Sequence, residues 1–354
     1  MEYQFSCLFS WTSGKPIIPS NGDIPIYGSN GIIGYTNDAK YENKIILGRV
    51  GAYCGSVAYC PGRFNATDNT LITSCVENKI TTHYAYYLLK SLNLNSFAGG
   101  AAQPLITQSI LKRLKCDIPS LNVQRRIASI LSTYDTLIEN NTKRIRLLEK
   151  MAENLYKEWF VRFRFPGHEK VEMENGLPKG WTVEKVKDWC RVFTGRKDVN
   201  QTKEDGQYVF FSCSPNTFHS DEFIYDGKAI LVAGNGSYTG RTRYFEGKFD
   251  LYQRTYAVVS NKEDDSFMFY LYLRFKFDFE PMHSGGTRGS AIPYIVMKDL
   301  TKYKFLYKED IVEEYIKKVK PMFAEIDNLQ QQNILLARQR DLLLPRLMSG
   351  KLEV

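Results

Sequence analysis

The chain has 354 residues, 43% of them hydrophobic, and its 47 lysines and arginines outnumber its 39 acidic residues by eight. This length predicts two or three domains with ordinary packed cores, and the positive balance favours a polyanionic partner without establishing one. The first residues lack a secretory signal pattern, and no apolar stretch approaches the roughly 18 residues of a membrane span. We therefore exclude a membrane protein and expect a cytoplasmic one.

The cysteines and histidines do not predict a metal site. The seven cysteines form no CxxC pair, and the four histidines are scattered along the chain. Structural zinc sites need pairs of these ligands at short, regular spacing. We expect reduced, buried cysteines and no bound metal.

Residues 1–118 predict a first β-rich domain. Short apolar runs are broken by Gly, Asn, Asp and Pro, as in DIPIYGSNGIIGY, which is typical of short strands and turns. A glycine-rich block, GAYCGSVAYCPGRF, occupies residues 51–64, and a second glycine landmark, GGAAQPLI, follows at 99–106.

Residues 119–165 predict a long spacer helix, capped near Asn122. Its 4-3 spacing of apolar positions never slips over four heptads, which favours a coiled coil and a rod of about 60 Å for ~40 residues. The stripe consists of Ile127, Leu131, Tyr134, Ile138, Asn141, Ile145, Leu148, Ala152, Leu155 and Trp159. The aromatic run Trp159, Phe160, Phe163 and Phe165 is expected to pack on the next domain, with partner docking as the alternative.

Residues 166–308 predict a linker and a second β-rich domain that repeats the first. The block GSYTGRTRYFEGKF at 236–249 aligns with 51–64 at an offset of 185 residues, with identical Gly, Tyr and Phe positions. A repeat of this length is a whole domain rather than a solenoid unit. The repeated phenylalanines and tyrosines are most simply explained as core or inter-strand contacts. For Tyr53 and Tyr238, whose flanking glycines allow close backbone approach, a groove-facing loop and a tight barrel corner both stay open. The first domain reaches Gly14 early, so we expect either an abbreviated opening strand or helix or an upstream start.

Residues 309–354 predict a second spacer helix, closed by Pro345 and Gly350. Its stripe pairs with that of the first helix in an antiparallel intramolecular coiled coil. In the expected register Asn141 meets Asn333 and Tyr134 faces Arg340, because buried polar groups prefer partners. The apolar pairs are Leu131–Leu343, Ile138–Leu336, Ile145–Leu329, Leu148–Ile326 and Ala152–Met322.

The order of β-domain, long helix, β-domain and long helix resembles the specificity subunit of type I restriction-modification systems. The phrases IPSLNVQRRIASILSTYDTLIENN at 118–141 and LLLPRLMSGKLEV at 342–354 carry the resemblance most specifically. It covers essentially the whole chain and implies an α+β fold with approximate two-fold symmetry.

The resemblance also implies a function. Each β-domain would be a target-recognition domain that reads one half of a bipartite sequence in double-stranded DNA. The paired helices would set the spacing and dock two methyltransferase subunits, which bind AdoMet. A nuclease-translocase subunit, which uses ATP and Mg, would join them. This chain itself would be non-catalytic and bind no cofactor.

Base reading and phosphate contact need Arg, Lys, Asn, Gln, Ser, Thr and Tyr on exposed loops. In the first domain we expect DNA contacts from Lys15, Ser29, Asn30, Arg49, Tyr53, Arg63, Asn65 and Gln103. In the second domain we expect them from Arg196, Lys197, Asn235, Ser237, Tyr238, Arg241, Arg243, Arg254, Thr287 and Arg288. Residues that differ between the repeats, such as Ser56 and Arg241, are expected to carry specificity.

Two other classes of function compete with this reading. An enzyme is disfavoured because the chain lacks an NPPY-like methyltransferase loop, and GNGSYTG at 234–240 lacks the lysine of a phosphate-binding loop. A scaffold with two ligand-binding β-domains on a coiled-coil stalk stays open as the alternative.

Overall fold

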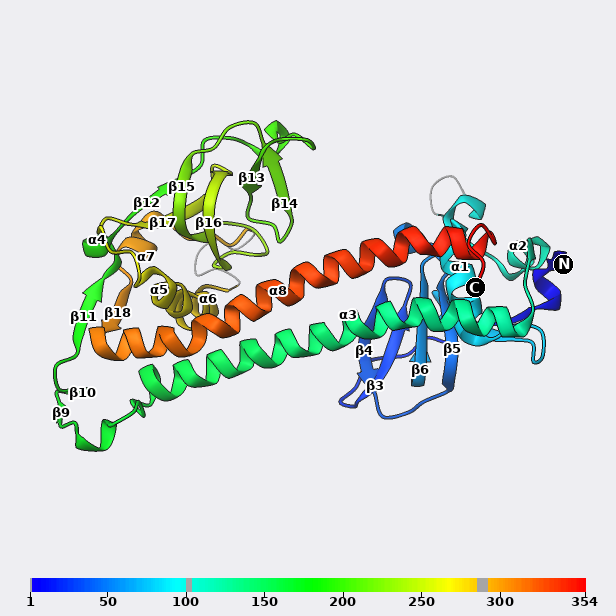
Figure 1. The fold of residues 1–354 in the computed structure, drawn as a ribbon, viewed down its shortest axis with the longest axis horizontal. Coiled ribbons are helices and arrows are strands. Elements are labelled where there is room, and N and C mark those ends of the chain that lie inside the picture. Colours follow the sequence, from blue (N-terminus) through cyan, green and yellow to red (C-terminus); the bar gives the residue numbers. More distant parts are fainter. Residues whose placement is uncertain (1, 100–103, 285–291) are drawn as a thin grey trace. The chain divides into compact units, whose positions relative to one another are not determined.

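The computed structural model describes residues 2–99, 104–284 and 292–354. It divides into two compact units, one of residues 1–143 with 328–354 and the other of residues 144–327. Each unit contains a curved six-stranded sheet with helices packed against it (Figure 1). The predicted α+β class, with two β-rich domains and two long helices, is confirmed.

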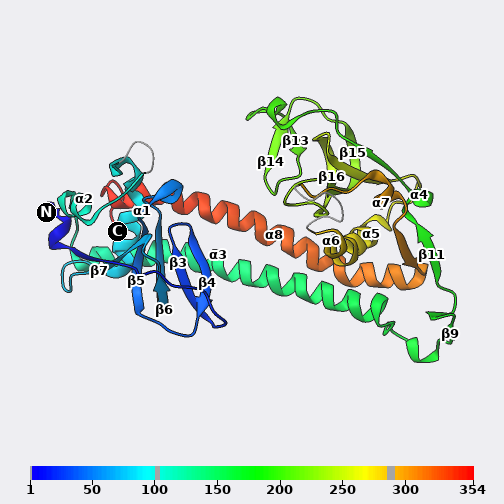
Figure 2. The ribbon, with the colours of Figure 1, turned by 180° about the vertical axis from the view of Figure 1, so that it is seen from behind.

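The first unit contains the first domain and the helix segments that pack on it. In chain order its strands and helices are β1 (Glu2–Gln4), η1 (Phe5–Cys7), β2 (Phe9–Ser13), β3 (Ile24–Gly28), β4 (Gly31–Thr36), β5 (Tyr41–Gly48), η2 (Gly51–Tyr53), β6 (Val57–Ala66), β7 (Thr70–Cys75), α1 (Thr82–Ser91), η3 (Leu94–Phe97), α2 (Gln108–Arg113), β8 (Lys115–Asp117) and the start of α3 (Leu121–Tyr156). In both views the two chain ends lie near the start of α3 (Figures 1 and 2).

The second unit repeats this order after the end of α3. Its elements are η4 (Lys157–Val161), η5 (His168–Lys170), β9 (Met173–Glu174), β10 (Leu177–Pro178), β11 (Thr182–Lys185), α4 (Val186–Trp189), β12 (Cys190–Thr194), η6 (Val199–Gln201), β13 (Tyr208–Phe211), β14 (Thr217–Ser220), β15 (Tyr225–Ala233), β16 (Thr242–Leu251), β17 (Thr255–Ser260), α5 (Met268–Arg274), η7 (Phe275–Phe279), α6 (Glu280–His283), α7 (Met297–Thr301), β18 (Lys304–Tyr307) and the start of α8 (Glu309–Met348).

The two sheets have the same topology. Their strand orders are β2-β7-β5-β6-β3-β4 and β12-β17-β15-β16-β13-β14. In both, the pair between the fourth and fifth strands of that order is parallel and the other pairs are antiparallel. A two-stranded ribbon, β1 with β8 or β11 with β18, completes each copy. The opening strand and helical turn, expected to be abbreviated in the first domain, are therefore present there as β1 and η1.

Both faces of each sheet are buried, because successive side chains of the central strand point to opposite faces. In β5, Ile45 and Leu47 belong to the core shared with the helices, whereas Ile46 joins a small cluster enclosed by the curved sheet around Phe64. In β15, Ile230 and Val232 face the helices, and Ala229 and Leu231 join the enclosed cluster around Phe249. The repeated phenylalanines are fully buried, as predicted.

Segments of α3 and α8 pair antiparallel within each unit, as predicted. In the first unit Leu131 and Leu343 belong to one core cluster, and in the second Ala152 and Met322 belong to another. Tyr315 Oη also donates a hydrogen bond to the carbonyl oxygen of Ala152 at 3.3 Å. The expected pair Ile145–Leu329 falls on different units and stays a prediction.

A polar layer interrupts the helix pair of the first unit. Asn141 Nδ2 donates to Gln332 Oε1 at 3.4 Å, and Asn333 Nδ2 donates to Thr142 Oγ1 at 3.5 Å. The two asparagines lie in the same layer, but each is bonded to the neighbour of the other. Asn333 Oδ1 is buried without a partner among the described residues. Such a layer costs stability and disfavours other registers.

A second polar contact joins three helices of the first unit. Asp135 accepts a hydrogen bond from Tyr87 Oη on α1 at 2.5 Å and forms an ion pair with Arg340 on α8. The expected partner of Arg340 was Tyr134. Its ion pair is instead with Asp135, the next residue in the sequence. Burial, and then the hydrogen bond to Asp135, raises the pKa of Tyr87 above its ordinary value, so the phenol stays a donor.

The aromatic run after α3 packs on the second domain, as predicted. Trp159, Phe160 and Phe165 are at most 4% exposed, and the ring of Phe160 contacts those of Tyr270 and Tyr315. This cluster fastens the end of α3 to the helices of its own unit.

The ends of the two long helices differ from the expected ones. α3 begins at Leu121, one residue before the predicted cap, where the buried side chain of Gln124 donates to the carbonyls of Lys79 and Pro119 and accepts from the amide of Thr81. α8 continues through Pro345 to Met348. Nowhere in the described ranges does a helix carry an apolar stretch long enough to cross a membrane.

Replacing Asp135 with alanine is expected to lower the free energy of unfolding by about 1–3 kcal/mol, because Arg340 and Tyr87 lose a shared, largely buried acceptor. The matched control on the same helix is Glu139→Ala, whose partner Lys143 is 62% exposed, so that loss should stay within about 0.5 kcal/mol. Equal shifts for the two variants in thermal unfolding would contradict this assignment.

Candidate nucleic-acid interface

Most of the predicted contact residues gather at one end of each sheet, which we call the loop end. In the first unit it consists of the turn after β5, the turn between β6 and β7, and the segments after β2 and β3. In the second unit it consists of the corresponding turns after β15 and between β16 and β17, and the segments after β12 and β13. The Arg49 amide donates to the Asn69 carbonyl at 2.9 Å, and Ser29 Oγ donates to the same oxygen at 2.6 Å. Lys15 is attached through its amide to the Ala66 carbonyl at 3.1 Å. Residues from four separate segments therefore meet there.

The glycine turn of the loop end has the same geometry in both units. Gly51 and Gly55 have φ of 74° and 86°, and their counterparts Gly236 and Gly240 have 82° and 85°. Only glycine adopts these values without strain. A side chain at position 55 would also meet the Asn95 amide nitrogen at 2.5 Å.

The same backbone hydrogen bonds close the turn in each unit. Gly51 donates to the Pro104 carbonyl at 3.1 Å and Gly55 to the Gly48 carbonyl at 2.8 Å. In the second unit Gly236 donates to Pro293 at 3.0 Å and Gly240 to Ala233 at 2.8 Å. The repeated glycines thus serve one turn, built twice.

The repeated tyrosines have two different environments. Tyr59 and Tyr244 are half-buried and contact aromatic rings of α1 and α5, as expected of inter-strand residues. Tyr53 and Tyr238 are 59% and 46% exposed at the tip of the glycine turn. The core or inter-strand interpretation therefore holds for Tyr59 and Tyr244 only. Tyr53 and Tyr238 lie on an exposed turn, as their place among the expected DNA contacts requires.

Three arginines distinguish the loop end of the second unit. Arg241 lies 5.7 Å from the ring centroid of Tyr238, and Arg254 is exposed. Arg243 donates from Nη2 to the Ser214 carbonyl at 2.6 Å and lies over the ring of Phe211. Burial, and then the positive charge of Arg241, lowers the pKa of Arg243 from its ordinary value. Desolvation and like charge make this a place where an anion would be stabilised.

The other predicted polar residues of the two loop ends differ in accessibility. Asn30, Arg196 and Ser237 are exposed. Asn235 is half-buried and accepts a hydrogen bond from Cys213 Sγ at 3.3 Å. The Nε atom of Arg49 is buried, with no hydrogen-bond partner within the described ranges.

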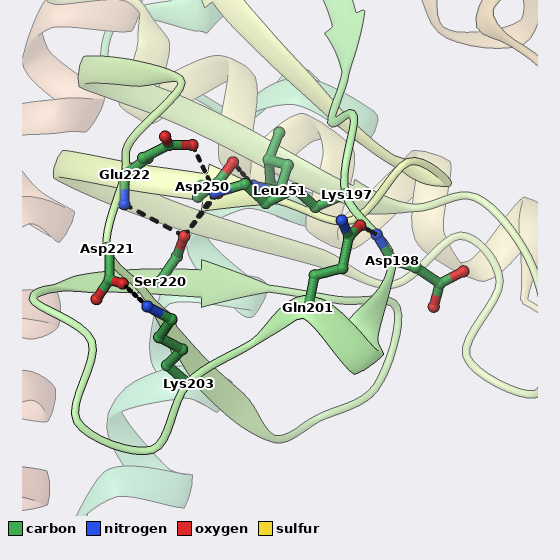
Figure 3. A network of polar contacts seen from close by, with 9 residues as sticks. All are labelled: Lys197, Asp198, Gln201, Lys203, Ser220, Asp221, Glu222, Asp250 and Leu251. Atoms are coloured by element: carbon green, nitrogen blue, oxygen red, sulfur yellow. Dashed lines mark hydrogen bonds and ion pairs between the residues drawn. The ribbon is translucent and has the colours of Figure 1, made fainter.

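Lys197 is occupied by an internal network (Figure 3). Its ammonium lies 2.8 Å from Asp250, 3.0 Å from Glu222 and 2.9 Å from Ser220 Oγ. Although burial opposes the change, these bonds raise the pKa of Lys197 above its ordinary value. Its charge is already compensated by two carboxylates, so Lys197 is a structural lysine.

Asn65, the counterpart of Asp250 in the first repeat, is also structural. It is 2% exposed, donates to the Asp38 carbonyl at 3.3 Å and accepts from the Ala66 amide. Asp250 accepts from the Leu251 amide in the same way. A direct DNA contact by Asn65 has no support in this geometry, because burial removes its amide from the surface.

The remaining predicted residues lie elsewhere or cannot be placed. Arg63 is exposed on β6 opposite Glu42, at the end of β5 away from the glycine turn. Gln103, Thr287 and Arg288 lie outside the described residues. The structure adds Asn69 to the candidate contact residues, because it is exposed at the loop end. The repeat could have indicated it, since the offset of 185 residues aligns Asn69 with Arg254. The carbonyl of Ser214 accepts the hydrogen bond from Arg243, and the sequence could not predict this contact because the two residues are 29 positions apart.

The first unit has an open hollow of about 530 Å³ beside its glycine turn. Its lining mixes polar residues, such as Ser56, Lys90 and Asn95, with apolar ones, such as Val57 and Leu92. Across the described ranges, no three His, Cys, Asp or Glu side chains come together as metal ligands, and each of the seven cysteines is a free thiol. The chemistry of the loop ends is therefore that of hydrogen bonding and positive charge.

Comparisons with known proteins identify relatives for both halves of the chain. A family model described as the type I restriction modification DNA specificity domain matches residues 12–150 and 178–307. The MjaIX type I restriction enzyme specificity subunit of Methanocaldococcus jannaschii is 29% identical over 314 residues, covering 78% of this chain and 71% of the relative. The EcoprrI specificity subunit of Escherichia coli is 35% identical over 131 residues, covering 37% of this chain and only 32% of the relative.

A solved structure has the same fold. The crystal structure of a type I restriction-modification S subunit from M. genitalium aligns with a TM-score of 0.68 over 98% of this chain and 96% of that one. The identity is 19%, so this similarity concerns the fold alone.

Replacing Asp250 with asparagine is expected to destabilise the second unit by about 1–3 kcal/mol, because a largely buried ammonium loses its nearest carboxylate. The first repeat suggests the compensating change: aligning Gly14 with Gly195 puts the uncharged Pro16 opposite Lys197, and Asn65 stands opposite Asp250. The double variant Lys197→Met/Asp250→Asn should therefore recover most of the loss in thermal unfolding. Additive losses in the double variant would show that the two residues act independently.

Proposed function

This chain belongs to the family of type I restriction-modification DNA specificity domains, and on that premise we propose that it binds double-stranded DNA and reads a bipartite target. Each six-stranded domain reads one half of the target through its loop end. The protein acts as the specificity subunit of a restriction-modification complex and carries out no catalysis itself.

One observation carries this proposal: two domains with the same strand order and the same glycine turn carry different chemistry at equivalent positions. At the offset of the repeat, Ser56 corresponds to Arg241, Ala58 to Arg243 and Asn69 to Arg254. A target with two unequal halves needs the same reading device twice, with different side chains facing the bases. In the major groove arginine pairs with guanine and asparagine with adenine, whereas serine can hydrogen-bond to several bases.

The charge at the loop ends supports DNA over an uncharged ligand. Arg241, Arg254 and Arg196 are not bound to any carboxylate among the described residues, and Lys15 and Arg49 supply cations in the first unit. Phosphate contact by such groups positions a protein on the duplex and makes binding dependent on salt.

The helix pair gives the proposed complex its spacing and its partners. Two half-sites on one face of the duplex are centred about one helical turn, or ~34 Å, apart. We propose that α3 and α8 hold the two domains at such an interval and offer their outer faces to two methyltransferase subunits and to a nuclease-translocase. In this scheme AdoMet is bound by the methyltransferase subunits, ATP and Mg by the nuclease-translocase, and the complex works in the cytoplasm on the chromosome.

The proposal is tested by co-expressing the chain with a type I methyltransferase subunit and mapping the methylated positions across the host genome. The expected result is one motif of two specific halves separated by unspecified bases. Duplex binding should also weaken steeply with salt: the logarithm of the binding constant should fall with the logarithm of the salt concentration, with a slope of about −0.9 per phosphate contact. A single uninterrupted motif, or DNA binding that does not respond to salt, would overturn the proposal.

The substitution Arg241→Ser, which installs the residue of the first repeat, is expected to change only one half of that motif. Losing an arginine contact to a base should cost about 1–3 kcal/mol of discrimination at one position. The other half and the spacer length should stay as they are. The matched control is Arg63→Ser, away from the loop end, which should leave both halves unchanged. If Arg241→Ser weakens binding uniformly without altering the motif, Arg241 contacts phosphate instead.

A further inference from the structure

Tyr53 and Tyr238 are equivalent exposed side chains on equivalent turns. They stand at the same position of the glycine turn, 185 residues apart, and are 59% and 46% exposed. The next residue points inward in both units, since Cys54 is 3% and Thr239 is 2% exposed. The turn therefore presents the aromatic ring to solvent twice, in domains whose neighbouring side chains differ.

The fold does not require an aromatic ring at this position. The carbonyl of Tyr53 accepts from the Ser56 amide at 3.1 Å, and that of Tyr238 accepts from the Arg241 amide at 3.0 Å. Any residue could supply that carbonyl, and the glycines on either side already meet the demand for positive φ. An exposed ring buries little apolar area, so its packing contributes little to stability.

Stacking on a neighbouring arginine does not explain the ring either. Arg241 lies over Tyr238 in the second unit. Its counterpart in the first unit is Ser56, whose hydroxyl donates to the Ser29 carbonyl at 2.6 Å. Both units keep the tyrosine, although the residue three positions later is a serine in one and an arginine in the other. The tyrosine position and that later position therefore have separate roles.

We propose that Tyr53 and Tyr238 contact the sugar-phosphate backbone of the duplex and bind both half-sites in the same, sequence-independent way. The inference rests on the proposed function. A side chain that is identical in both domains suits a feature that both half-sites share, and the backbone is common to both. An exposed phenol offers a neutral O–H donor to a phosphate and a flat apolar ring to a sugar. Neighbouring residues that differ, such as Arg241, are left to read the bases.

The test uses the full chain, alone and with a co-expressed methyltransferase subunit, and two labelled duplexes: the methylated motif and a scrambled sequence. Tyr53→Ala and Tyr238→Ala should each weaken binding to both duplexes about three- to tenfold, the worth of one or two polar contacts. The double variant should lose the product of the two factors. The ratio of the two affinities should not change, and neither should the salt slope, because a tyrosine releases no counterion.

Matched controls separate this contact from a general loss of structure. Tyr35→Ala removes a tyrosine that is 48% exposed on β4 and away from the glycine turn, and it should leave binding unchanged. Tyr53→Phe and Tyr238→Phe keep the ring, so a loss of binding equal to that of alanine assigns the contact to the hydroxyl. All variants should unfold at the temperature of the wild type.

Each contrary outcome has a distinct meaning. A wild-type chain that binds neither duplex overturns the proposed function itself. A wild type that binds, together with alanine variants that bind equally well, overturns only this inference. Variants that change the preferred sequence show that the tyrosines read bases. Variants that keep DNA binding but lose the methyltransferase subunit show that this turn docks a protein, which also contradicts the inference.

Discussion

Each sheet of this protein has to bury both of its faces, and it uses the long helices to do so. The curved sheet encloses one face by itself, around Phe64 or Phe249. The other face, with Ile45 and Leu47 in one unit and Ile230 and Val232 in the other, shares a core with helical segments. Leu131 and Leu347 belong to the first of these cores and Tyr315 to the second, so α3 and α8 are parts of the domain cores as well as connectors.

This need to bury both faces explains which positions stay apolar in both repeats and which positions differ between them. Hydrophobic burial at about 25 cal/mol per Å² favours keeping the faces toward the helices apolar in both repeats. Apart from the inward-pointing Cys54, the described side chains of the glycine turns lie outside these cores, and each turn is closed by backbone hydrogen bonds that other side chains would preserve. Arg241 and Ser56 can therefore occupy the same place in two nearly identical frames. A recognition surface that must change without loss of the fold is best placed there.

The polar groups inside the frame follow the same division. The layer of Asn141, Thr142, Gln332 and Asn333, and the contact of Asp135 with Arg340 and Tyr87, lie in or beside the helix pair of the first unit. Buried polar pairs add little net stability, but they penalise every arrangement that separates them. Lys197 and Asp250 form such a pair in the second domain. The first repeat has Pro16 and Asn65 at the equivalent positions, so both members of the pair differ together.

Much of this organisation could be read from local patterns. The two helix stripes, the two β-rich domains and the repeated glycine turn have regular spacing, which reflects the geometry of helices, strands and positive-φ turns. The antiparallel helix pairing followed from matching apolar stripes. The individual contact residues were harder to predict. Asn65 and Lys197 have side chains typical of surface positions, but Asn65 is buried and Lys197 is ion-paired inside the second unit.

The class of fold, the duplication and the long helices can be inferred from the order of the amino acids, because each depends on periodicity along the chain. Which polar side chains are free depends on how the chain folds in three dimensions. Lys197 meets Asp250 across 53 residues and Asn65 reaches Asp38 across 27. Such contacts depend on strand order and sheet curvature, which bring distant segments together, and no local spacing encodes them.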